Sequence, residues 1–562
     1  MKNPFKALLL AVLAAMLVLT GCGGGGNDPA KTLSYKDAAE QVRAYVDSGK
    51  VQYSTVEHGE DTSWVGVDTT AEDLPPIDKY PLSVEGKGDI VVTIASSTEK
   101  ANVKQERWLD QMARKFNASG ATVNGKRVAI SIRPIASGLA LDYITSGKHI
   151  PDAYSPSNEL WTPMIQSSGV KVQQVEKRLA GNTAGILLKQ DVYDTFTKKY
   201  GAVTVPNVVK AVMAGDLVLA HTDPNQSSTG LNILTQELLA LDGTNPLSPK
   251  AVEAYRQFQA KVPPTSPTTD EMSKVAAKGL ANAMIMEAQA FAAQPALATG
   301  WKFTPVGVRH DSPLYALDGP SKDKLEALNL FSKFSISAEG QESASQFGFN
   351  QYNDYKGADS KLSAAQLFGA LDAWKNNKDA GVPVVSMFVV DRSGSMDENS
   401  KMDQAKKALR AASSYISPNN YVGLVSYSSD VTLDLPIGKF DDKQHSRFVG
   451  AVNDLRPNGG TATNSAIIAA LHQMLQFQAA GQNVKFRIIL LSDGMQSGGL
   501  ELKQALEVVG GLKVPVYGIS FETGSELSSM QALAGVSESA YVITADGQDA
   551  ASKLRAMARA EL

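Results

Sequence analysis

From residue 382 to the C-terminus, short apolar runs alternate with stretches of helical periodicity. The runs have the length and character of buried strands, at 382–390, 421–427, 486–491 and 514–521. Helical spacing fills the segments between them, at 401–416, 461–478 and 500–509. Strands that alternate with helices need crossover connections, so this region predicts a doubly wound parallel α/β sheet with helices on both faces.

Oxygen-bearing side chains follow or interrupt these predicted strands. They are Asp391, Ser393, Ser395, Thr461 and Asp493. Asp391 and Asp493 come directly after their strands, and ligands of such sheets bind beyond the carboxyl ends of the strands. Hard divalent cations such as Mg²⁺ prefer oxygen ligands in octahedral geometry and usually keep some water. The pattern therefore predicts a divalent-cation site; the alternative is a set of ordinary solvated turns.

The motif Asp-x-Ser-x-Ser at 391–395, with a distant Thr and a distant Asp, resembles the von Willebrand factor A (VWA) family over residues 382–562. The resemblance implies a Rossmann-like fold and a metal-ion-dependent adhesion site that holds Mg²⁺, Mn²⁺ or Ca²⁺. It implies that Ser393 and Ser395 contact the cation, that Thr461 joins on ligand binding, and that Asp391 and Asp493 orient waters.

A mostly neutral inner shell would leave such a cation electrophilic. We therefore expect a protein partner that supplies an Asp or Glu carboxylate as the last ligand. Asp397 and Glu398 follow closely and either hold a second cation, as in integrin-type relatives, or form a solvated acidic turn. Their spacing departs from the pattern of those relatives and favours the turn.

The N-terminus has the features of a signal peptide. Lys2 and Lys6 precede the apolar run 7–19, which is too short to span a bilayer comfortably. The following Leu-Thr-Gly-Cys resembles the bacterial lipobox, which implies a lipoprotein signal peptide at 1–21 and lipidation of Cys22. An uncleaved anchor with an incidental cysteine is the alternative. The Gly-rich residues of 22–35 then form a flexible tether.

Lipidation would place the protein on a cell membrane or outer membrane, facing the periplasm or the exterior. Gly23 stands where an Asp commonly retains lipoproteins at the inner membrane, which favours the outer membrane in a diderm host. Cys22 is the single cysteine, so no disulfide is available and stability must come from large cores. A net charge of −4 gives no basic footprint for nucleic acid.

The region 85–378 also reads as strands followed by helices, with hydroxyl- and Gly-rich loops between them. The stretch Asp-Pro-Asn-Gln-Ser-Ser-Thr-Gly at 223–230 resembles the segment that opens the second lobe of type 2 periplasmic solute-binding proteins. The resemblance implies two lobes and a cleft for a small molecule or anion. Candidate contacts are Ser96, Ser97, Ser137, Ser157, Ser227, Ser228 and Glu287. Helix capping is the alternative role for each serine.

Residues 36–84 are harder to place. A helix is expected within 31–50, and the polar stretch 51–84 predicts an irregular segment on the first lobe or a spacer. The junction at 371–383 is short, which motivates the hypothesis that cleft closure moves the adhesion site.

Catalytic motifs are not evident: the sequence has no nucleophile elbow, phosphate-binding loop or His-Glu-x-x-His site. We therefore predict a binding protein rather than an enzyme. The preferred interpretation is an envelope lipoprotein that captures a protein partner through its metal site. The alternative is a transporter-associated solute receptor whose VWA domain docks it to an envelope complex.

Overall fold

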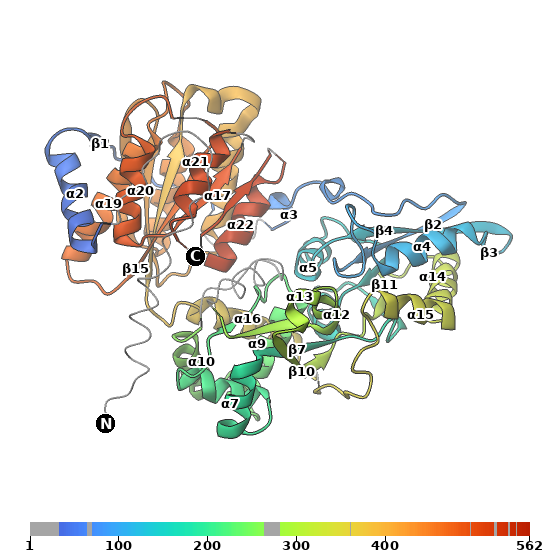
Figure 1. The fold of residues 1–562 in the computed structure, drawn as a ribbon. Coiled ribbons are helices and arrows are strands. Elements are labelled where there is room, and N and C mark those ends of the chain that lie inside the picture. Colours follow the sequence, from blue (N-terminus) through green and yellow to red (C-terminus); the bar gives the residue numbers. More distant parts are fainter. Residues whose placement is uncertain are drawn as a thin grey trace, which may run out of the picture.

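The computed structural model describes residues 33–64, 70–262, 281–359, 361–494, 496–521, 525–537, 540–546 and 548–561. The predicted signal peptide and Cys22 lie outside these residues. A C-terminal α/β domain sits at one end of the molecule and a two-lobed domain at the other (Figure 1). Within the described ranges, no helix is both long enough and apolar enough to cross a bilayer.

The C-terminal domain is built on a seven-stranded sheet in the order β1-β14-β13-β12-β15-β16-β17. Its central strands are β13 (Tyr421–Tyr427), β12 (Val384–Asp391), β15 (Lys485–Ser492) and β16 (Val516–Ser520). Successive side chains of β12 enter opposite cores, because strand residues alternate between faces. Met387 and Val389 pack with α19 (Thr463–Ala479) and α20 (Leu502–Leu512), whereas Phe388 and Val390 pack with α17 (Lys401–Ser413) and α22 (Ala550–Glu561).

One strand pair breaks the expected parallel order. Strand β14 (Val431–Lys439) runs antiparallel to β13, while β12, β15, β16 and β17 (Val542–Thr544) pair in parallel. Only residues 428–430 separate β13 from β14, and so short a link can form a hairpin but no crossover. The prediction of a parallel sheet is therefore confirmed for β12, β13, β15, β16 and β17 and wrong for β14.

The first described residues belong to the C-terminal domain. Strand β1 (Tyr53–Thr55) pairs in parallel with β14 and extends the sheet. Helix α2 (Tyr35–Asp47) packs on α20, so closely that a Cβ on Gly511 would lie 2.5 Å from the Cβ of Ala38. Figure 1 shows α2 beside α19 and α20, far from the two-lobed domain. The two-lobed domain is thus inserted between β1 and β12 of one sheet.

The helix expected within 31–50 is present as α2, and its apolar side chains join the core formed with α19 and α20. The expectation for 51–84, an irregular segment on the first lobe or a spacer, is wrong for residues 53–55, which pair with β14. Residues 70–84 do lie against the first lobe: Tyr143 donates to the carbonyl of Pro75 (2.7 Å), and Val84 bridges to Ile132. Leu74 is buried in the same core.

Because α2 is part of the C-terminal core, a cavity in it should destabilise that domain. Val42 is fully buried, and Val42→Ala in the full chain should cost roughly 1–3 kcal/mol. Glu40→Ala, on the exposed face of the same helix, is the matched control and should change little. Calorimetric unfolding of both variants checks this, and equal melting profiles would contradict the assignment of α2 to this core.

The two-lobed domain contains one sheet per lobe. The first lobe carries the order β3-β4-β2-β5-β11-β6 and the second β10-β7-β9-β8. They include β3 (Thr122–Val123), β4 (Lys126–Pro134), β6 (Val172–Glu176) and β8 (Leu219–Ala220). Strands β2 (Ile90–Ser96), β5 (Ala153–Ser155) and β11 (Leu314–Leu317) lie in the first lobe. The second contains β7 (Thr183–Lys189), β9 (Ala283–Glu287), β10 (Trp301–Arg309) and helix α9 (Ser228–Leu241). The chain crosses between lobes at 177–182 and 310–313.

A buried ionic cluster joins the two domains. Asp142, on α5 (Ser137–Thr145) of the first lobe, accepts from Arg555 (2.6 Å) and Arg559 (2.7 Å) of α22. The guanidinium of Arg559 also lies over the ring of Tyr415 at 4.6 Å. Desolvated arginines of this kind need their counter-charge, so the cluster fixes α22 against the first lobe.

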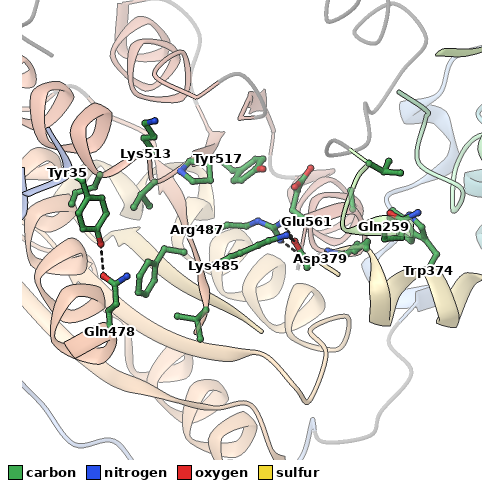
Figure 2. A pocket seen from close by; sticks show the side chains of 18 residues that line it. Tyr35, Gln259, Trp374, Asp379, Gln478, Lys485, Arg487, Lys513, Tyr517 and Glu561 are labelled. Carbon is green, nitrogen blue, oxygen red and sulfur yellow. Dashed lines mark hydrogen bonds and ion pairs between the residues drawn. The ribbon is translucent and has the colours of Figure 1, made fainter. Parts of the chain in front are cut away.

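A second cluster surrounds the junction between α16 (Ala364–Asn377) and β12. Asp379 accepts from Arg487 (2.7 Å) and pairs with Lys378 and Lys485 at 3.3 Å. Burial alone would raise the pKa of Asp379, but these three cations outweigh it and lower the pKa. Figure 2 shows Asp379 and Arg487 in a cavity of about 420 Å³ that extends from Tyr35 to Trp374. The cavity adjoins the first residues of β15, at the sheet edge opposite Asp391.

Removing the acceptor of the first cluster should loosen the contact between domains. Asp142→Ala leaves two desolvated guanidinium groups unpaired, which typically costs about 3–5 kcal/mol. Asp78→Ala is the control, because Asp78 is 89% exposed and its pair with Arg133 contributes little. Small-angle scattering should show a larger radius of gyration for Asp142→Ala alone; unchanged profiles would contradict a docked arrangement.

Candidate functional site

The predicted metal ligands meet at the carboxyl edge of the C-terminal sheet. Strands β12 and β15 pair in parallel through Val390 and Leu491, so Asp391 and Asp493 emerge at the same edge. Ser393 and Ser395 follow in the loop and turn η4 (Gly394–Ser400). Thr461 reaches the edge from the loop before α19, where its hydroxyl would lie 3.8 Å from a Cβ on Gly494.

Hydrogen bonds connect four of these five residues. The Oγ of Ser393 lies 3.1 Å from the Oγ of Ser395, which donates to Oδ1 of Asp493 (2.9 Å). Asp391 accepts from the backbone N–H of Ser393 (2.8 Å) and from the hydroxyl of Ser492 (2.7 Å). The loops are tied together as well, since Gly394 N–H donates to the carbonyl of Gly459 (3.0 Å). The edge is therefore a defined cluster of oxygens.

This cluster fits a small divalent cation. Neighbouring ligands of an octahedral Mg²⁺ at 2.0–2.1 Å are separated by about 2.9 Å. The oxygen separations of 3.1 and 2.9 Å around Ser395 match that edge length. Among the described residues, no group of three or more His, Cys, Asp or Glu side chains could hold a metal ion. The fit thus depends on hydroxyls, which is the donor set expected from the sequence.

Lys401 is the side chain at this site that the sequence reasoning missed. It is the first residue of α17, and its Nζ lies 2.7 Å from Oδ2 of Asp493. Both side chains are buried, so the ammonium compensates one of the two carboxylates. In the sequence, Lys401 could be recognised only as a lysine that directly follows the oxygen-rich loop. A bound metal would share Asp493 with this ammonium, which keeps the net charge of the site low.

The remaining acidic residues lie apart from this cluster. Asp397 and Glu398 have exposed side chains in η4, and the next residues, Asn399 and Ser400, have φ of 53° and 57°. Such left-handed residues turn the chain sharply before α17 begins. This placement is that of an acidic turn.

The carboxylate of Asp391 is buried and lies near the carboxylate of Asp493. Burial raises the pKa of Asp391 above its ordinary value, and the nearby Asp493 adds to the shift, while Ser393 and Ser492 oppose it. A carboxyl group whose pKa is raised by folding binds more protons in the folded state. The free energy of unfolding therefore falls as pH rises through the folded pKa, and the ionised group destabilises the metal-free protein above it.

Asp391→Asn should therefore stabilise the metal-free protein at neutral pH. The amide keeps the side-chain shape without the desolvated charge. In EDTA, denaturant unfolding followed from pH 4 to pH 8 should show a stability gain that shrinks as the pH falls and Asp391 becomes protonated. A loss of stability in the variant at pH 8 would contradict this account. Asp397→Asn, exposed in the same loop, is the control.

Each of the seven candidate contacts of the cleft makes hydrogen bonds within the protein. Ser97 and Ser157 donate to Oε1 of Glu99 (2.6 and 2.9 Å). The hydroxyl of Ser96 donates to the carbonyl of Ser97 (3.3 Å). Glu99 was not among the candidates, although it follows β2 within the same loop.

The second-lobe candidates are engaged in the same way. Ser227 caps α9 by accepting from Gly230 N–H, as the capping alternative predicted. Ser228 donates to Ser137 across the lobes (3.1 Å). Glu287 accepts from His310 Nδ1 (2.8 Å).

Family models identify both domains. Residues 92–350 match the model described as bacterial extracellular solute-binding protein, and residues 386–496 match the von Willebrand factor type A domain. Human collagen alpha-1(XXI) chain is 28% identical over 142 residues, covering 25% of this chain and 14% of the collagen. This chain therefore spans a small part of that relative.

Two solved structures give likenesses for the separate domains. A von Willebrand factor type A protein from Catenulispora acidiphila covers 32% of this chain and 42% of its own, with 21% identity and a TM-score of 0.29. The sulfate-binding protein SubI from Mycobacterium tuberculosis covers 50% of this chain and 98% of its own, with 16% identity and a TM-score of 0.36.

The protein is thus a mixed α/β protein that combines a bacterial solute-binding domain with a VWA domain, and the solute-binding region is inserted between β1 and β12 of the VWA sheet. The solute-binding family indicates a secreted or envelope-facing location. The matched solute-binding family is one of binding proteins rather than enzymes.

Proposed function

We propose that this protein is a lipid-anchored envelope protein that captures a protein partner through a divalent cation at its VWA domain. Asp391, Ser393, Ser395, Thr461 and Asp493 would hold Mg²⁺, or Mn²⁺ or Ca²⁺ in its place. The observation that carries the proposal is the oxygen cluster around Ser395, in which Ser393, Ser395 and Asp493 converge from two strand ends within hydrogen-bond distance.

The charge of the site supports a carboxylate as the partner's ligand. A bound cation would supply an electrophilic position at the edge of the sheet. Two carboxylates face it, and Lys401 already compensates Asp493. Net positive charge would therefore remain for an Asp or Glu side chain of the partner, and a charge-assisted contact of this kind is stronger than a neutral one.

The position of α2 supports an orientation in which the metal site faces away from the membrane. Tyr35 contacts Gln478, and both line the cavity at the sheet edge opposite Asp391. Lipidation at Cys22 would attach the chain a short tether before this point, because each extended residue spans at most about 3.5 Å. The metal edge would then face away from the anchor.

A solute receptor is the second candidate function, because residues 92–350 match a solute-binding family. In that case the cleft binds a small molecule and the VWA domain docks the receptor to an envelope complex. The two functions differ in the effect of Asp391→Ala, which would abolish partner capture in the first and spare solute binding in the second.

Calorimetric titration of Mg²⁺ and Mn²⁺ tests the metal site directly. We expect saturable binding by the wild type and about a 10–100-fold loss of affinity in Asp391→Ala, since groups that orient metal ligands typically contribute this much. Asp397→Ala removes a nearby exposed carboxylate and should retain the wild-type affinity. An equal loss in both variants would indicate non-specific charge. Absence of saturable binding by the wild type would refute the metal site.

A further inference from the structure

The carboxyl edge of the first-lobe sheet carries a largely buried ion pair of its own, Glu99 and Lys100. Oε1 of Glu99 accepts from the hydroxyls of Ser97 (2.6 Å) and Ser157 (2.9 Å) and from Lys100 Nζ (3.1 Å). Lys100 is fully buried and also donates to Ser97 and to the carbonyl of Pro156. Burial opposes ionisation of Glu99, but Lys100 and both serines outweigh it and lower its pKa.

These donors come from the loops after β2 and β5, at the carboxyl edge of the first-lobe sheet. Two hydroxyls and an ammonium donate to the Glu99 carboxylate there, and a bound anion would be held by donors of the same kind. The Glu99 side chain therefore uses the donors that an incoming anion would need. A free anion could bind these donors only by displacing the Glu99 carboxylate. The displaced carboxylate would remain beside Lys100 and repel the anion.

Glu287 plays a corresponding part at the crossing between lobes. Its carboxylate accepts from Asn182 (2.7 Å) and from His310 Nδ1 (2.8 Å), one residue from each crossing segment. The other ring nitrogen of His310 accepts from the amides of Asn158 (3.1 Å) and Asn232 (3.0 Å), which belong to different lobes. Asn158 and Asn232 have fixed orientations because Leu160 N–H and Val308 N–H donate to their carbonyl oxygens.

Direct contacts then hold the lobes together. Ser228 accepts from Trp161 Nε1 (2.8 Å) and donates to Ser137 (3.1 Å). Gly138 N–H donates to the carbonyl of Gln226 (3.2 Å), and a Cβ on Gly138 would lie 1.8 Å from the carbonyl oxygen of Asn225. Leu231 and Leu367, which come from α9 and α16, are fully buried in a core made mostly by the first lobe. Opening the lobes would expose this apolar surface.

We propose that Glu99 is a built-in anion that occupies the donors beyond β2 and β5 which an oxyanion ligand would need, so that oxyanions are excluded, while Glu287, His310 and Ser228 hold the lobes together. The domain then acts as a rigid spacer between β1 and β12 of the VWA sheet. This inference goes beyond the proposed metal site and does not depend on it.

Chemical rescue of Glu99→Ala tests the proposal in the full chain. Removing the carboxylate takes away the acceptor of Ser157 and one acceptor each of Ser97 and Lys100, so the melting temperature of the solute-binding domain should fall by several degrees. Formate or acetate at millimolar concentration should restore it by filling the vacated position. Wild-type protein should show no shift and no saturable binding with formate, acetate, sulfate or phosphate.

Two variants serve as controls. Glu99→Gln fills the same space without charge, so formate should not stabilise it. Glu106→Ala removes an exposed carboxylate from the same loop, where Glu106 pairs with Arg114 at the surface, and should behave as the wild type. Saturable binding of sulfate or phosphate by the wild type would overturn the proposal, and so would a folded Glu99→Ala that no carboxylate restores.

Scattering provides a test that needs no folded Glu99→Ala. Wild-type protein should give the same scattering profile with and without sulfate, phosphate or acetate, at the radius of gyration of joined lobes. Gly138→Ala should force the lobes apart and increase that radius, because the added methyl group meets a backbone carbonyl. A wild type that is open in buffer and closes on addition of one of these anions would refute a built-in anion.

Discussion

The parallel pairing of β12 with β13 and β15 is the constraint on which the rest of this structure depends. It sets the carboxyl ends of β12 and β15 side by side, so Asp391 and Asp493 face one another although 101 positions separate Asp391 from Ser492, its hydrogen-bond partner in β15. The same pairing places the first residues of these strands at the opposite edge, where the junction from the solute-binding domain and helix α2 arrive. The candidate metal site therefore lies at the opposite end of the sheet from the junction between α16 and β12.

The carboxylates of this protein fall into two physical groups. Asp142 and Asp379 are buried, and each pairs with at least two cations. Such pairs hold elements together, because removing one member leaves an unpaired, desolvated charge. Asp391 is buried with hydroxyl and amide donors and no cation among its hydrogen-bond partners, so its ionisation is disfavoured. Undercompensated negative charge at a sheet edge attracts a cation, whereas the overcompensated carboxylates at the junctions serve rigidity.

A rigid connection between the two domains changes the role expected of the solute-binding domain. The ionic clusters at Asp142 and Asp379 fasten the VWA domain to both ends of the solute-binding domain. If Glu287, His310 and Ser228 hold the lobes together, closure of the cleft cannot be the signal that reaches the metal edge, which weakens the coupling hypothesis drawn from the short junction. The solute-binding fold then contributes length and orientation, and binding is left to the VWA domain.

The sequence by itself determined the strands β12, β13, β15 and β16, the helices α17, α19 and α20, and the oxygen-bearing side chains that follow the strands, because periodicity and an Asp-x-Ser-x-Ser loop are short-range patterns. Strand β13 was predicted at its observed bounds, and β12 and β15 within two residues. The tertiary structure alone decided that β1 joins β14, that Lys401 compensates Asp493, and that Glu99 takes the hydroxyls of Ser97 and Ser157. Each of these contacts depends on packing between residues that lie far apart in the sequence. The bond between Arg555 and Asp142, which are 413 positions apart, is another example, and no local pattern in a single sequence predicts such a contact.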